Sequence, residues 1–396
     1  MAISKKTERF MNQASWIRRM FEEGLRLRQE PNAAPVYDFT LGNPILEPPT
    51  AVQQALREAV LNPTPGMHRY MPNAGYPECR ERVGEYLRRD LGVPIEGEDV
   101  IMTSGAAGAM NVALKSLIDP GDEVVVIAPY FPEYFFYIDS VGGVITVAES
   151  TADFDLDLAA IERAVGVRTR VLILNSPNNP TGRLYSETRL RELGELLADK
   201  ERLTGAPITI LSDEPYRKIV FDGRTAPSVM AAHPNTILIN SHSKDLGLPG
   251  ERIGYAAISP AHPDRRELHN ALTFNNRALG FVNAPALFQR VVADVQEARV
   301  DVGQYQRLRD QFFRGLSQAG LRCVQPEGAF YLFPQTPTRD DMAFVRALQR
   351  YRVLAVPGSG FGRSGHIRLC FCVTPEEIDG ALPGIEQAVA DSRALI

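Results

Sequence analysis

The sequence predicts an α/β protein in which a large domain with a mainly parallel central sheet is joined to a smaller α+β domain. From about Thr50, short apolar runs rich in β-branched residues alternate with helical stretches, the pattern of βαβ units with helices on both faces of the sheet. After about Asn283, long helical stretches are followed by several short strands. A chain of 396 residues also suits roughly two or three domains. We therefore assign residues 1–48 to an N-terminal arm with part of the small domain, 49–283 to the large domain and 284–396 to the small domain.

The N-terminal arm is expected to begin with a helix. Apolar residues in Ala14–Arg28 recur at the spacing of an amphipathic helix. Prolines then punctuate an irregular connection that carries Gly42, and a glycine permits close approach of the backbone to a ligand.

The strands of both domains are expected at short β-branched or aromatic runs. For the large domain these runs are residues 100–103, 123–128, 144–147, 171–175, 208–212, 236–240 and 255–258. For the small domain they lie near Cys323 and at 330–333, 353–356 and 367–371. In open parallel sheets, ligands bind outside the carboxyl ends of the strands, so candidate site residues are sought there.

The composition is that of an ordinary globular protein, with 44% hydrophobic and 23% charged residues and a net charge of −5. Nothing in it indicates nucleic acid as a partner. No run approaches the roughly 18 apolar residues of a membrane span, and the first residues lack the apolar region of a signal peptide. The four cysteines are too scattered for a disulfide framework, and we assign no metal site. A cytoplasmic location and no membrane partner are expected.

One lysine stands immediately after a predicted strand. Lys244 follows the run at 236–240, and a lysine whose pKa is lowered by burial or by a nearby cation becomes a nucleophile toward carbonyl groups. Arg252 could be that cation and could also bind an anion. The hydroxyls of Ser241 and Ser243 are short donors suited to a phosphate. Taken alone, the same residues would also fit a solvated loop.

A second strand end joins a helix through small residues. Ser104, Gly105, Ala106 and Ala107 would let a phosphate reach the backbone N–H groups at a helix N-terminus, where the helix dipole adds to the attraction. Taken alone, this turn is equally explained by tight packing.

Three further positions carry polar side chains that suit a cofactor or substrate. Asn179 lies in the turn N-P-T-G, and Asp213 and Tyr216 place a carboxylate and a phenol three residues apart after another strand. Arg368 lies among apolar neighbours on a late strand, where a buried guanidinium must be paired and matches the geometry of a carboxylate.

In this order along the chain, these motifs resemble the class I and II aminotransferases, which are fold type I enzymes that use pyridoxal phosphate (PLP). The resemblance runs from Gly42 to Arg368. It implies that Lys244 carries PLP, that Asp213 pairs with the ring nitrogen and that Tyr216 and Asn179 bond to the 3-oxygen. It also implies a stacking partner for the ring and a phosphate site, which we assign to the following residues: Phe131 for the ring, and Ser104, Gly105, Ala106, Ala107, Ser241, Ser243 and Arg252 for the phosphate.

The same resemblance assigns the substrate and the quaternary structure. Arg368 would clamp the α-carboxylate of an amino acid together with Asn179, and the amide of Gly42 is a further candidate. Tyr70 resembles the tyrosine that one subunit contributes to its neighbour's cofactor phosphate, which implies a homodimer with a shared active site. Arg277 is a candidate for the distal carboxylate of a dicarboxylic substrate, or else a surface or interface arginine.

The function predicted is transfer of an amino group from an α-amino acid, aspartate-type or broad, to a 2-oxo acid, by family expectation 2-oxoglutarate. One alternative is a PLP-dependent lyase that catalyses β-elimination on the same fold. A second is a non-catalytic PLP-binding module, such as the domain fused to some transcriptional regulators. The lack of room for a basic helix-turn-helix domain before Gly42 counts against the second alternative.

Overall fold

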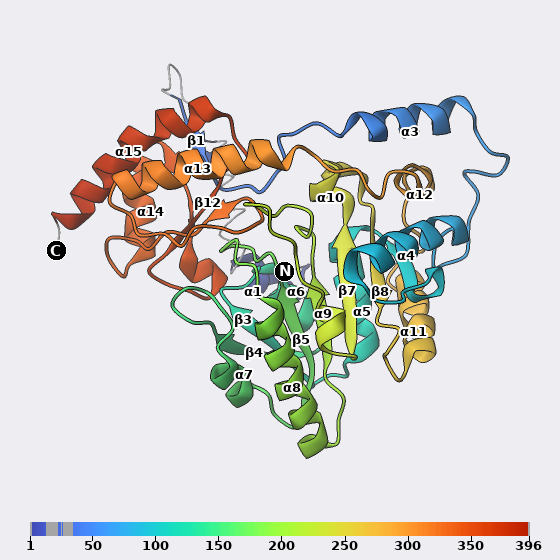
Figure 1. The fold of residues 1–396 in the computed structure, drawn as a ribbon. Helices are drawn as coiled ribbons and strands as arrows, with labels where there is room; N and C mark the ends of the chain where they lie inside the picture. The colour runs from blue at the N-terminus through green and yellow to red at the C-terminus, as the bar shows by residue number, and fades with distance from the viewer. Residues whose placement is uncertain (1, 13–22, 25, 27–34, 395–396) are drawn as a thin grey trace.

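The computed structural model describes residues 2–12, 23–24, 26 and 35–394. The helix predicted at Ala14–Arg28 falls largely outside these residues. The described chain forms a large lower body around a central sheet and a smaller upper body built from the C-terminal part, with the short β1 (Tyr37–Asp38) alongside it (Figure 1).

The central sheet has seven strands in the order β2-β8-β7-β6-β5-β3-β4. Only β8 runs antiparallel to its two neighbours, β2 and β7, and the other pairs are parallel. Every strand predicted for the large domain is present, with ends that differ by at most two residues: β2 (Val100–Thr103), β3 (Glu123–Ala128), β4 (Val144–Glu149), β5 (Thr169–Asn175), β6 (Thr209–Asp213), β7 (Thr236–Ser241) and β8 (Gly254–Ile258). The mainly parallel α/β architecture predicted from the sequence is confirmed.

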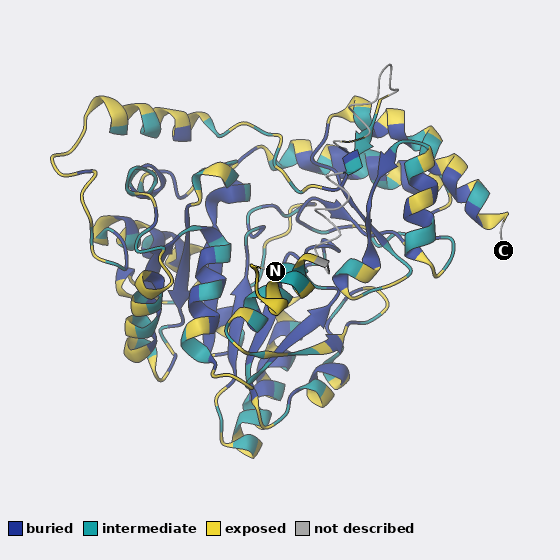
Figure 2. Cartoon of the chain, turned by 180° about the vertical axis from the view of Figure 1, so that it is seen from behind, coloured by how far each residue is buried: buried dark blue, intermediate teal, exposed yellow. Residues whose placement is uncertain are grey.

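Helices cover both faces of this sheet because the strands carry apolar side chains on both sides. One face packs against α5 (Gly105–Leu117), α6 (Glu133–Ser140) and α11 (Arg265–Ala278). The other face packs against α4 (Pro77–Leu91), α12 (Ala286–Ala293), α7 (Leu158–Ala164) and α8 (Glu187–Thr204), with α9 (Val229–Ala232) beside α8. The inner strands are consequently buried, as Figure 2 shows, whereas the edge strand β4 is mostly exposed or half-buried. The long α3 (Thr50–Leu61) packs on α12 at the edge of the large body.

The upper body is an α+β unit. Antiparallel strands β11 (Val356–Pro357), β12 (Ile367–Cys370) and β9 (Tyr331–Leu332) form one small sheet, and β1 pairs in parallel with β10 (Val353–Leu354). Helices α13 (Val302–Gln318), α14 (Asp341–Arg350) and α15 (Pro375–Arg393) pack around them. The strand expected near Cys323 is wrong, because residues 321–326 form no regular element. The pairing of β1 with β10 agrees with giving part of the N-terminal arm to this unit, and the exact domain boundaries stay predictions.

The two bodies share one core. Tyr216 and Phe221 of the large body are buried in the same apolar cluster as Phe39, Tyr305 and Phe330 of the upper body. Such a continuous core fixes the strand ends of the large body next to β9 and β12, and the site described below lies at this junction.

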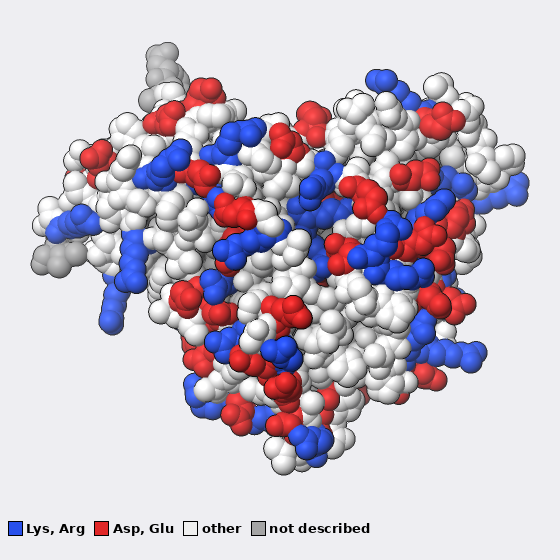
Figure 3. All heavy atoms as spheres, viewed as in Figure 1, with Lys and Arg blue, Asp and Glu red and all other residues white. Residues whose placement is uncertain are grey.

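The surface carries interspersed charges. On the face shown in Figure 3, basic and acidic side chains alternate over both bodies. Among the described residues, no helix combines the length and the apolarity that crossing a membrane requires.

Candidate active site

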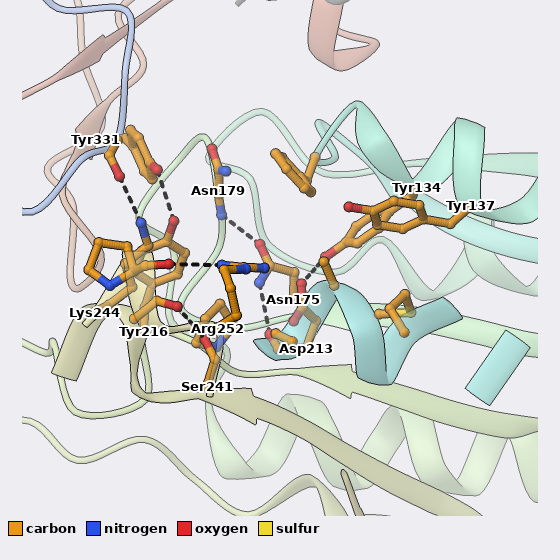
Figure 4. A pocket seen from close by; sticks show the side chains of 18 of the residues that line it. Tyr134, Tyr137, Asn175, Asn179, Asp213, Tyr216, Ser241, Lys244, Arg252 and Tyr331 are labelled. Carbon is orange, nitrogen blue, oxygen red and sulfur yellow. Dashed lines mark hydrogen bonds between the residues drawn. The ribbon is translucent and has the colours of Figure 1, made fainter. Parts of the chain in front are cut away.

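A cavity of about 300 Å³ opens where the carboxyl ends of β5, β6 and β7 meet the N-terminus of α5 and the strands β9 and β12 (Figure 4). Asn175, Asp213 and Ser241 are each the last residue of their strands. The predicted site residues that line the cavity are Gly42, Ala106, Ala107, Phe131, Asn179, Asp213, Tyr216, Ser241, Ser243, Lys244, Arg252 and Arg368. Ser104 and Gly105 lie immediately before this lining, at the start of α5.

Lys244 enters the cavity from the single turn of α10 (His242–Asp245), directly after β7. Its Nζ donates a hydrogen bond to the carbonyl oxygen of Gly42 at 2.7 Å and lies 5.3 Å from the ring centre of Phe330. Burial, above all, lowers the pKa of Lys244, and the positive charges of Arg368 and Arg252 lower it further. The amine is therefore closer to its neutral, nucleophilic form than an exposed lysine would be.

An anion-binding corner lies at the N-terminus of α5. Ser104 occupies the N-cap position but makes no side-chain capping bond, so the first N–H groups of the helix stay available. Gly105 has φ +70°, and a Cβ there would lie only 3.0 Å from Nη2 of Arg252, so glycine is needed for this close approach. Ser241 and Ser243 complete the corner, with their hydroxyl oxygens 3.1 Å apart.

The far end of the cavity holds a buried carboxylate. Asp213 accepts a hydrogen bond on Oδ2 from the phenol of Tyr134. Burial raises the pKa of Asp213 to about 6, and the bond from Tyr134 opposes that rise. Asn175 links two predicted site residues, because its Nδ2 donates to the carbonyl of Asp213 at 2.8 Å and its Oδ1 accepts from the backbone N–H of Asn179 at 2.7 Å.

A guanidinium lies at the opposite side of the cavity. Arg368 is 1% exposed and lies between the rings of Tyr331 and Phe361, at 4.6 and 4.9 Å from their centres. It donates to Oδ1 of Asn179 at 3.2 Å and to the carbonyl of Thr40, whereas its Nε is buried without a hydrogen-bond partner. In the part of the chain that the structure describes, no carboxylate pairs with this charge, so the group is suited to an incoming carboxylate.

Two predicted residues lie outside this cavity. Tyr70 is 92% exposed and lines a groove with residues 68, 69, 71, 281–284 and 286. Arg277 is exposed on α11, with its guanidinium 5.6 Å from the ring of Phe274. Within one chain, neither residue reaches the cavity.

Of the cavity residues that had no predicted role in the site, three form hydrogen bonds with predicted site residues. Asn175 and Tyr134 carried no predicted role, and Tyr331 was interpreted as part of a structural turn. In the structure Tyr331 forms a 2.8 Å hydrogen bond with Tyr216, and a Cβ at Gly42 would lie 2.0 Å from its Oη. The signal for Asn175 was its place at a strand end. Tyr134 lies one helical turn after Phe131 and has no such signal.

The residues present fit PLP. The cofactor needs a reactive amine, an anion site for its phosphate and an acid partner for its ring nitrogen. Lys244, the α5 corner and Asp213 supply these three groups within one cavity, and Arg252 in that corner forms no ion pair with any described residue. The fold and the site together define a PLP-dependent enzyme with the fold type I architecture.

Comparison with known proteins narrows this class. Residues 34–385 match the family model described as "Aminotransferase class I and II", and the chain belongs to this family. It is 32% identical over 364 residues to the "Probable aspartate/prephenate aminotransferase" of Thermus aquaticus, with 89% of this chain and 91% of that protein covered. It is 31% identical to the "Aspartate/prephenate aminotransferase" of Thermus thermophilus, with coverages of 87% and 88%.

Solved structures agree with this assignment. An aminotransferase from Eubacterium rectale superposes with a TM-score of 0.95 at 36% identity, covering 99% of each chain. The aspartate aminotransferase of Thermus thermophilus with maleate gives a TM-score of 0.86 at 28% identity, covering 98% of this chain and 100% of that chain. The chain is thus a PLP-dependent aminotransferase, whose substrates are amino acids and oxo acids.

Proposed function

We propose that this enzyme moves the amino group of an aspartate-type or a broader set of α-amino acids to 2-oxoglutarate, with PLP bound to Lys244. One observation carries the proposal. The cavity holds the amine of Lys244 together with two sites for anions. One is the buried guanidinium of Arg368, and the other is the N-terminus of α5, which has no side-chain cap. An amino acid and a phosphorylated aldehyde present the complementary groups.

Each part of the cofactor has a candidate partner. The phosphate would be held by the backbone N–H groups of Gly105 to Ala107 and by Arg252, with hydroxyls from Ser241, Ser243 and Ser104. Phe131 offers a flat ring for stacking, which supplies buried area and orientation. Asp213 would pair with the ring nitrogen, and Tyr216 and Asn179 would donate to the 3-oxygen.

The protein's own residues would bind the amino acid and move its proton. When bound, the cofactor supplies an electrophilic carbon and an electron-withdrawing ring that makes the α-proton of an amino acid removable. Arg368 binds the α-carboxylate, with Asn179 beside it and the Gly42 backbone as a further candidate contact. The free amine of Lys244, with its lowered pKa, would take the proton from the Cα of the donor amino acid. In the half-reaction that forms the new amino acid, it would deliver a proton to the Cα of that product.

The preferred substrate is supported only by the relatives. Their names include aspartate, prephenate and N-acetyl-LL-diaminopimelate, all of them amino acids or oxo acids with a polar group beyond the α-carbon. Of the described residues, Lys244, Arg252 and Arg368 are the cations that line the cavity. A distal carboxylate would then need a cation from elsewhere, and Arg277 of a second subunit is the candidate.

The proposed enzyme is a homodimer in which Tyr70 of each subunit reaches the cofactor phosphate of the other. Tyr70 is exposed and lines a groove, and Phe274 and Leu279 are exposed on and just after α11; this exposure supports the arrangement, because exposed apolar patches mark interaction surfaces. The cytoplasmic location expected from the sequence stays a prediction.

The first test of the proposal is the position of the cofactor. The protein is incubated with PLP, reduced with borohydride and mapped by mass spectrometry, and the label should be on Lys244. Lys218 is the matched control, because this lysine, whose side chain is 10% exposed, already forms an ion pair with Asp245 at 3.2 Å. A label on Lys218 or on another lysine would contradict the assignment.

The second test separates amino transfer from elimination. Amino donors are supplied with 2-oxoglutarate, and both glutamate and free ammonia are measured. Glutamate formed in proportion to the donor's oxo acid supports the proposal. Ammonia as the dominant product across the donors would favour a lyase instead.

A further inference from the structure

Tyr134 is a buried phenol for which the proposed function has no use. It lies in the first turn of α6, is 2% exposed and packs edge-on against Phe131, with ring centres 5.6 Å apart and planes at 86°. Its place in the core of α5, α6 and the sheet holds the ring in one position. Figure 4 shows its hydroxyl directed at Asp213.

The charge of Asp213 depends unusually on this one hydroxyl. In the described chain Oδ2 accepts from Tyr134, Oδ1 has no hydrogen-bond donor, and no cation forms an ion pair with the carboxylate. The adjacent Glu214 differs, because Ser212 donates to it at 2.6 Å and Arg217 pairs with it at 2.8 Å. A buried carboxylate with so few donors is costly to ionise.

The phenol can act only as a donor here. Burial next to Asp213 raises the pKa of Tyr134 well above its usual value, so the hydroxyl keeps its proton over the whole working range. Its bond to Oδ2 fixes the rotation of the carboxylate and leaves Oδ1 as the oxygen free for another partner.

We propose that Tyr134 is a positioning residue that orients and keeps ionised the carboxylate of Asp213, so that Oδ1 serves the ring nitrogen of bound cofactor. This inference rests on the proposed function, since it requires PLP in the cavity. It assigns to Tyr134 a role that acts through Asp213 and touches neither substrate nor reacting atoms.

The test compares two ligands on reconstituted apoenzyme. One is PLP, and the other is the analogue in which the ring nitrogen is replaced by C–H. Tyr134→Phe should weaken PLP binding about 10- to 100-fold, which is the change in affinity expected when one hydrogen bond to a charged group is lost. It should leave analogue binding unchanged, because the phenol then stabilises the free and the analogue-bound enzyme equally. The ratio of the two affinities is the readout.

Tyr137→Phe is the matched control. Tyr137 lies one turn further along α6 and lines the same cavity, but its hydroxyl makes no hydrogen bond to Asp213. Its removal should leave the affinity ratio at the wild-type value. If Tyr134→Phe fails to fold, as judged by thermal unfolding of the apoenzyme, Tyr134→Leu removes the hydroxyl in a smaller side chain.

The outcomes separate the two proposals. An unchanged affinity ratio in Tyr134→Phe, or equal losses for PLP and the analogue, would overturn the role of Tyr134 and leave it as a packing residue. Failure of the wild-type protein to bind PLP would overturn the proposed function itself.

Discussion

The cavity and the exposed face around Tyr70 differ in how far one chain completes them. In the cavity, Lys244, Asp213 and Arg368 come from three separate strands or strand ends and line one common space. On the face, Tyr70, Phe274 and Arg277 are exposed, and the described chain contributes little that covers them. The catalytic groups can therefore be assigned within one subunit, whereas a second subunit would act on phosphate retention and substrate choice.

The largest expected effect is at Lys244, on the cavity side. Lys244→Ala should lower kcat on the order of 10²- to 10⁴-fold, the range for removal of a positioned acid–base group. Turnover with an amino-donor panel measures it, and Lys218→Met serves as the control for loss of a buried lysine. Full activity in Lys244→Ala would mean that the cavity is not the catalytic centre.

The second-largest effect on activity is expected at Arg368. Arg368→Leu should reduce kcat/KM for α-amino acids while PLP binding is kept, because the substrate carboxylate loses a buried partner. The reduction should correspond to a loss of about 2 to 5 kcal/mol in transition-state stabilisation. Arg309→Leu is the matched control, since Arg309 is equally buried but already bonded to Asp222 at 2.8 and 2.9 Å. The control should lose stability with little change in KM. Equal KM increases in both variants would remove the substrate role of Arg368.

Asp213 gives a pH-dependent prediction for the cofactor-free protein. Its pKa is raised from 3.8 to about 6, so the folded state binds more protons than the unfolded state between these values. The free energy of unfolding should therefore fall by about 2 kcal/mol as pH rises from about 4 to 6, and level off above about pH 7. Urea unfolding of wild type and Asp213→Asn at both pH values measures this difference. Parallel pH profiles for the two proteins would contradict it.

A test of Tyr70 bears on whether the exposed face is completed by a second subunit. Tyr70→Phe should weaken PLP retention about tenfold, the loss of one charged hydrogen bond of about 1.5 kcal/mol. Mixing Lys244→Ala subunits with Tyr70→Ala subunits should restore part of the activity, because one of the two sites in a hybrid dimer is then intact. A fully active enzyme that light scattering finds monomeric at assay concentration would contradict an active site shared between two subunits.

Arg277 should have the most selective effect. Arg277→Ala should lower kcat/KM for aspartate and 2-oxoglutarate by about 10- to 100-fold and leave alanine and pyruvate little affected, because only the first pair carries a distal carboxylate. Steady-state kinetics with the four substrates decide it. Equal losses for both pairs would make Arg277 a structural residue of the exposed face.

Local patterns in the sequence were enough to predict the fold class and most of the residues that line the cavity. Strand-forming runs and the polar residues that follow them are local signals. Lys244, Asp213 and Asn179 could therefore be predicted to lie at a ligand site from their places after strands. Arg368 could be assigned because a guanidinium among apolar neighbours requires a partner wherever the strand lies.

Contacts between residues that are far apart in the sequence depend on the tertiary structure and could not be predicted from local patterns. Tyr134 reaches Asp213 across 79 positions of sequence, and Tyr331 meets Tyr216 across 115. No local pattern distinguishes such phenols from ordinary core residues, because their partners are set by how α6 and β9 pack against the ends of the central strands. The strand expected near Cys323 failed for the same physical reason, since tertiary packing overrides the weak β-propensity of a short apolar run.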